Sequence, residues 1–154
     1  MRNQKANIKV VVIDASAVTR YLLTEILEQA GDIEVVASVH DTAEALNKIQ
    51  NLRPHVITLD VTMPGLNGLT FLEKLKELHP TPVVIVSAMS EYQGDSVLRA
   101  MELGAVGYVG KQTTQTWSGI LSLADEIIEK VRTASTVQLQ ADITARGQAA
   151  AGNF

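Results

Sequence analysis

The sequence alternates between short runs of β-branched and aliphatic residues and longer amphipathic stretches, and this alternation limits the possible folds most strongly. The short runs predict strands at residues 9–13, 33–39, 55–59, 82–86 and 106–109. Several runs are apolar throughout, which is typical of parallel strands covered by helices on both faces. Parallel neighbours require crossover connections, and these are right-handed. The pattern therefore predicts a doubly wound α/β domain with a parallel five-stranded sheet.

The amphipathic stretches predict five helices, over residues 18–30, from residue 41 onward, and over residues 69–78, 96–103 and 114–132. Gly31 and Gly104 follow the first and fourth stretches as stop signals. The second helix opens with Asp41-Thr42-Ala43-Glu44, which has the side chains of an N-terminal capping box. Pro80 prevents the third helix from continuing.

Size and composition favour a single domain with few options for chemistry. A chain of 154 residues has the length of one domain with one core. We expect residues 1–132 to form that domain and residues 133–154, rich in Gln, Ala, Thr and Gly, to be a tail or interdomain linker. The absence of cysteine excludes disulfides, thiolate zinc sites and a cysteine nucleophile.

Charge and hydropathy bear on partners and location. The formal charge is −4 and there is no run of basic residues, so direct binding of nucleic acid is disfavoured. The apolar runs are shorter than the ~18 residues of a membrane helix, and we expect no membrane insertion. Because no secretion signal is visible at the N-terminus, we expect a cytoplasmic protein.

Polar side chains follow four of the predicted strands. Asp14 follows the first strand, Asp60 the third and Ser87 the fourth, and Lys111 comes shortly after the fifth. Ligands of such folds bind beyond the carboxyl ends of the strands, so we expect these four side chains to converge there. Two carboxylates, a hydroxyl and an ammonium are suited to phosphoryl chemistry, because a carboxylate can attack phosphorus and the other groups can bind the phosphoryl oxygens.

Four segments of the chain carry a family resemblance: VVIDASAVTR, ITLDVTMPGLNG, TPVVIVSA and LRAMELGAVGYVGK. In order and spacing they resemble the receiver domain of two-component response regulators, over about residues 8–130. The chain is most similar to the receiver of chemotaxis protein-glutamate methylesterases. The resemblance implies a flavodoxin-like (βα)5 fold with strand order 2-1-3-4-5. It also implies a phosphorelay receiver that switches a protein-binding surface, with a role in chemotaxis.

The resemblance also implies roles for individual residues. These are the phosphoacceptor Asp60, a Mg²⁺-holding set of Asp14, Asp60 and the carbonyl of Thr62, and a switch and phosphoryl-binding set of Ser87, Tyr108 and Lys111. The implied partners are a histidine kinase as phosphodonor and a downstream protein or attached effector domain. A homodimer through the last helix is left open.

The chain departs from the family pattern at two positions. Ala15 stands where the family has a second acid, and Mg²⁺ binds through few carboxylates, so we expect Mg²⁺ binding to be weak or absent. Gln112 follows the lysine where many relatives have proline. The alternative is therefore a metal-impaired pseudo-receiver that acts as a phosphorylation-independent interaction module.

Other readings of the same residues are less favoured. The chain has no G-x-S-x-G motif and too few residues after Arg132 for a catalytic domain, so we expect no esterase activity of its own. A flavin-binding role is disfavoured because Asp14 stands where a flavin phosphate needs donors. Tyr108 is as compatible with simple packing as with a switch. His40, His55 and His79 are scattered, and we expect surface or half-buried roles for them.

Overall fold

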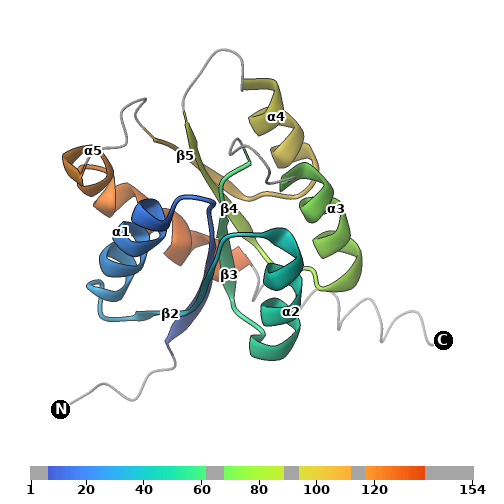
Figure 1. The fold of residues 1–154 in the computed structure, drawn as a ribbon, viewed down its shortest axis with the longest axis horizontal. Helices are drawn as coiled ribbons and strands as arrows, with labels where there is room; N and C mark the ends of the chain where they lie inside the picture. The colour runs from blue at the N-terminus through green and yellow to red at the C-terminus, as the bar shows by residue number, and fades with distance from the viewer. Residues whose placement is uncertain (1–6, 62–67, 89–93, 112–116, 138–154) are drawn as a thin grey trace.

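The computed structural model describes residues 7–61, 68–88, 94–111 and 117–137, and these form a parallel sheet between two layers of helices (Figure 1). In chain order the elements are β1 (Ile8–Ile13), α1 (Ala17–Glu28), β2 (Ile33–Val39), α2 (Thr42–Leu52), β3 (Val56–Leu59), α3 (Gly68–Leu78), β4 (Val83–Ala88), α4 (Gly94–Glu102), β5 (Gly107–Lys111) and α5 (Trp117–Leu121), followed by a helix over residues 124–137. The strands lie in the order β2-β1-β3-β4-β5, all pairs parallel. The predicted fold class and strand order are confirmed.

The sheet separates two core layers, because successive side chains of a strand point to opposite faces. Helices α2, α3 and α4 cover one face, and α1, α5 and the helix over residues 124–137 cover the other (Figure 1). The first core layer lies under α2 to α4 and includes Val11, Ile13, Ile57, Leu59, Ile85, Ile49, Phe71, Leu72, Leu75 and Ala100. The second core layer lies under α1 and the last helix and includes Val10, Val12, Val56, Val84, Val86, Val109, Leu23, Leu27, Ile127, Val131 and Ala134.

Local capping explains where the first two helices begin. Ser16 precedes α1, and its hydroxyl accepts a hydrogen bond from the backbone N–H of Thr19 at 3.2 Å. Asp41 precedes α2, and its carboxylate accepts one from the backbone N–H of Glu44 at 2.7 Å. Both bonds satisfy amides that a helix leaves without partners in its first turn. The predicted start of the second helix is confirmed.

The end of the chain differs from the expected single helix over residues 114–132. Helix α5 ends at Leu121, and a new helix runs from residue 124 to 137; residues 114–116 lie outside the described part. The Ser122 hydroxyl donates to the carbonyl of Gly119 at 2.8 Å, and the N–H of Leu123 donates to the carbonyl of Ile120 at 3.0 Å. Bonds that reach back three residues take the place of the α-helical bonds and interrupt the helix.

Two strands extend further than the sequence predicted. β4 continues to Ala88 and β5 to Lys111, so Ser87 and Lys111 lie inside strands rather than after them. Ser87 pairs in register with Gly110, and Ala88 pairs with Lys111. The sheet itself therefore fixes the backbone of both residues. Across the described part of the chain, no helix has the length and apolar character needed to cross a membrane.

Candidate functional site

The carboxyl ends of β1, β3, β4 and β5 bring Asp14, Asp60, Ser87 and Lys111 together, as the sequence predicted. Asp14 and Asp60 directly follow β1 and β3. The Asp14 N–H donates to the carbonyl of Val39 at 3.1 Å, and the Asp60 N–H donates to that of Ile13 at 3.2 Å. These bonds hold both backbones against the neighbouring strand, so the two carboxylates start from fixed positions.

Lys111 joins the two carboxylates. Its Nζ lies 2.7 Å from Oδ2 of Asp60 and 3.1 Å from Oδ2 of Asp14. The exposed fraction is 0% for Lys111 and Asp14 and 1% for Asp60. Charged side chains are almost never buried to this degree unless they are paired. The three groups therefore form one buried ionic cluster.

Ser87 connects the same cluster to the backbone beyond β3. Its hydroxyl donates to Oδ1 of Asp60 at 2.9 Å and accepts a hydrogen bond from the backbone N–H of Val61, also at 2.9 Å. The Ser87 side chain is fully buried. One oxygen of Asp60 thus accepts a hydrogen bond from the Ser87 hydroxyl, and the other accepts one from the Lys111 ammonium.

Two residues that the sequence reasoning missed hold Asp14 from the side of α1. The Ser16 N–H donates to Oδ1 of Asp14 at 2.9 Å, and Nη1 of Arg20 donates to the Asp14 carbonyl at 2.7 Å. The position of Ser16 before a helix is a recognisable capping signal, but nothing in the spacing of Arg20 indicates its contact. Burial raises the pKa of the Asp14 carboxyl, and the nearby Lys111 ammonium partly offsets this.

The described residues do not fit the Mg²⁺ ion that the resemblance implies. All four carboxylate oxygens of Asp14 and Asp60 already accept a hydrogen bond or ion pair, from Ser16, Lys111 and Ser87. Ala15 has no oxygen in its side chain, and Thr62 lies outside the described residues. Mg²⁺ demands near-octahedral oxygen coordination. What joins the carboxylates here is an ammonium group.

Tyr108 lies on β5, where it pairs in register with Ile85. Its ring is half-buried and packs against the first core layer. Burial raises the pKa of its hydroxyl. This placement agrees with a packing role, and the expected switch role stays a prediction.

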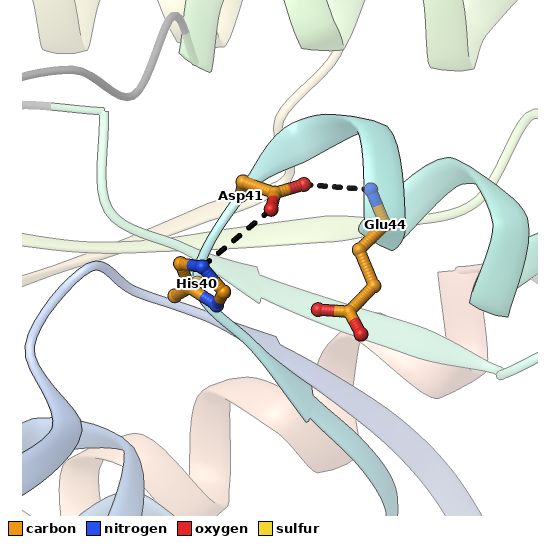
Figure 2. A group of neighbouring side chains, drawn as sticks. All are labelled: His40, Asp41 and Glu44. Carbon is orange, nitrogen blue, oxygen red and sulfur yellow. Dashed lines mark hydrogen bonds and ion pairs between the residues drawn. The ribbon is translucent and has the colours of Figure 1, made fainter.

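A second group of ionisable side chains lies at the start of α2 (Figure 2). One ligand atom each from His40, Asp41 and Glu44 lies within 4.8 Å of the others. The sequence signal for this group is the pair of acids at positions 41 and 44 beside His40, not the spacing of the histidines. Both oxygens of the Asp41 carboxylate already have a partner. One accepts a hydrogen bond from the Glu44 N–H at the start of α2, and the other lies 3.6 Å from Nε2 of His40. Capping of α2 accounts for the arrangement.

Comparison with known sequences gives a consistent family assignment. The family model described as response regulator receiver domain matches residues 10–117. A protein-glutamate methylesterase/protein-glutamine glutaminase of Xanthomonas oryzae pv. oryzae is 46% identical over 134 residues, which are 87% of this chain and 37% of the relative. A protein of the same name from Nitrosomonas europaea is 46% identical over 132 residues, 86% of this chain and 37% of the relative. The chain thus spans little more than a third of the length of these relatives.

Solved structures agree with the sequence comparison. The response regulator domain of Thermotoga maritima CheB has a TM-score of 0.77 and 35% identity, with 84% of this chain and 97% of that chain covered. The receiver domain of the response regulator NarL from Mycobacterium tuberculosis has a TM-score of 0.64 and 28% identity, with 81% and 98% covered. Both likenesses include nearly the whole of the other chain, so the match is to complete receiver domains.

Proposed function

The chain belongs to the response regulator receiver domain family, and from that membership we propose that it is a signalling switch controlled by phosphorylation of Asp60. The observation that carries this proposal is the arrangement around Asp60. Its buried carboxylate contacts Lys111 at 2.7 Å and Ser87 at 2.9 Å, and these two groups can bind phosphoryl oxygens. A strand-end carboxylate that only initiated a turn would not need them.

The proposed chemistry is transfer of one phosphoryl group. An Asp60 carboxylate oxygen attacks the phosphorus of the donor, a P–O bond to Asp60 forms, and the bond between phosphorus and the donor breaks. The electron pair of that bond leaves with the donor. The Lys111 ammonium offsets charge on the phosphoryl oxygens, and the Ser87 hydroxyl donates a hydrogen bond to one of them.

The Ser87 hydroxyl supports a route from the site to the surface. It bridges Asp60 and the N–H of Val61, so a phosphoryl group on Asp60 competes for it. Ser87 pairs in register with Gly110, two residues after Tyr108. A change at Ser87 therefore acts on β5, where it biases the packing of Tyr108 and the neighbouring surface.

The relatives suggest a pathway for the switch. Several carry the name protein-glutamate methylesterase/protein-glutamine glutaminase. We propose that this chain takes its phosphoryl group from a histidine kinase in chemotaxis signalling and regulates an effector domain or partner protein. The domain is regulatory in this proposal and has no esterase activity of its own.

A second candidate function is a docking module that works without phosphorylation. Ala15 favours it, because the side chain at the family position for a second acid has no oxygen here. In this case the receiver fold is kept for its surface. The two candidates differ in whether Asp60 ever gains a phosphoryl group.

Intact-mass spectrometry after incubation with acetyl phosphate separates the two functions. We expect the wild type to gain the mass of one phosphoryl group and Asp60→Asn to gain none. Incubations with and without Mg²⁺ are run side by side. No gain in either condition rejects the switch and leaves the docking module.

A further inference from the structure

We infer that Lys111 is the resident cation of this site and takes the place of a divalent metal, so that the Asp14–Asp60 pair is closed to Mg²⁺ in this chain. The inference rests on the proposed function only for the choice of site. It contradicts what family membership alone would suggest, and it follows from the contacts of Lys111 and from Ala15.

The contacts of Lys111 leave little opportunity for a second cation. Its Nζ lies between the carboxylates, 2.7 Å from Asp60 and 3.1 Å from Asp14, and all three side chains are buried. Two of the three ammonium N–H groups are thereby used. A divalent ion between the same oxygens would face the ammonium at close range in a site shielded from water, where repulsion between like charges is strong.

The small number of ligands available to a metal also disfavours Mg²⁺ binding. Mg²⁺ is usually bound through one or two carboxylates with water completing the octahedron. Here both carboxylates are paired with Lys111, and the side chain of Ala15 carries no oxygen. Removing one acid from such a site reduces the attraction for a doubly charged ion more than that for a singly charged ammonium.

Arg20 adds positive charge beside Asp14. Its Nη1 donates to the Asp14 carbonyl at 2.7 Å from the first turns of α1, and Ser16 holds Oδ1 of the same residue. Asp14 is therefore flanked by Arg20 on its backbone side and by Lys111 on its carboxylate side. Phosphorylation of Asp60 is then expected to proceed at a rate that Mg²⁺ does not change.

The test is a Mg²⁺ titration of the full chain without a phosphodonor, followed by the amide NMR signals of Asp14, Ser16 and Val61 and by thermal unfolding. NaCl at matched ionic strength controls for screening. Amides of α2 are excluded, because the exposed acids near His40 attract cations unspecifically. The variants are Ala15→Asp, which restores the second acid, and Lys111→Met, which removes the ammonium at similar length.

We expect no saturable change in the wild type, and Mg²⁺ binding that is stronger by about tenfold or more in Ala15→Asp. Mg²⁺ should also raise the unfolding temperature of Lys111→Met. The inference is overturned if the wild type saturates at the same Mg²⁺ concentration as Ala15→Asp, or if a folded Lys111→Met gains nothing from Mg²⁺. If Lys111→Met does not fold, the comparison with Ala15→Asp decides. Since no phosphodonor is present, this result is separate from success or failure of Asp60 phosphorylation.

Discussion

Asp14 is a carboxyl group whose burial opposes its charge. Burial raises its pKa above 3.8, and Lys111 and the Ser16 amide only partly compensate. A carboxyl with a raised pKa in the folded state contributes stability below its unfolded pKa, and this contribution is lost as pH rises through the folded pKa. We predict that the side-chain ¹³C signal of Asp14 titrates with a midpoint above 3.8. A midpoint at or below 3.8 would show that the ion pair with Lys111 outweighs burial.

Thr58 on β3 carries a buried hydroxyl without a hydrogen-bond partner among the described residues. It pairs in register with Val12 and Val84 of the second core layer. A buried polar group without a partner is costly, and valine has nearly the same shape. We predict that Thr58→Val raises the free energy of unfolding by about 1 kcal/mol in urea titrations. Thr58→Ser, which keeps the hydroxyl, is the control and should destabilise; a loss of stability in Thr58→Val would mean that the hydroxyl has a partner.

Single residues differ in how far the sequence reveals them. Asp14, Asp60, Ser87 and Lys111 could be expected to meet, because each follows a predicted strand and parallel strands end at one edge of the sheet. The contact from Arg20 to the Asp14 carbonyl could not, since a long flexible side chain reaches many backbone atoms and only the folded turn selects one. The bridging position of Lys111 also depends on three-dimensional placement.

At the scale of elements, the first residue of α3 controls the segment after Asp60. A Cβ on Gly68 would lie 2.8 Å from Cγ1 and 2.9 Å from Cα of Val61, which directly follows Asp60. Helix propensity alone would favour alanine, but contact with backbone cannot be relieved by turning a side chain. We predict that Gly68→Ala lowers the free energy of unfolding by about 1–3 kcal/mol and shifts the amide signal of Val61.

The matched comparison for Gly68→Ala is Glu73→Ala, an exposed position five residues further along the same helix. Its effect on stability should stay within about 0.5 kcal/mol. Equal stabilities of the two variants would mean that α3 moves freely relative to Val61. Urea titrations and one NMR spectrum for each variant provide both measurements.

Elements were predictable where one physical signal dominated. The strands were found because continuous apolar runs bounded by polar residues are a strong signal. Their ends were less certain, and β4 and β5 each continue two residues further because pairing between Ser87 and Gly110, and between Ala88 and Lys111, extends the ladder. The break after Leu121 was missed because the hydrophobic period continues across it. The helix is interrupted by two hydrogen bonds that each reach back three residues, from the Ser122 hydroxyl to the Gly119 carbonyl and from the Leu123 N–H to the Ile120 carbonyl.

At the scale of the whole molecule, the parallel order of the strands creates the site. β1 and β3 are neighbours in the centre of the sheet, and β4 and β5 follow on one side. Asp14 and Asp60 therefore start side by side, and Lys111 reaches them from the edge strand β5. This topology could be predicted from the sequence, and with it the meeting of these side chains at one edge of the sheet. The pairing of one ammonium with two carboxylates could be seen only in the folded structure.

The extent of the packed domain is also a property of the whole molecule. The expected boundary of the domain at residue 132 stays a prediction. The last helix continues to residue 137, and Ala134 is 1% exposed beside Val131 in the second core layer. A carboxylate at position 134 would be buried without a partner, while one at the exposed neighbour Thr133 would lie in water. We predict that Ala134→Asp lowers the free energy of unfolding by about 2 kcal/mol or more, and Thr133→Asp by less than about 0.5 kcal/mol, in urea titrations at neutral pH. Equal effects of the two variants would place residue 134 outside the folded domain and support the expected boundary at residue 132.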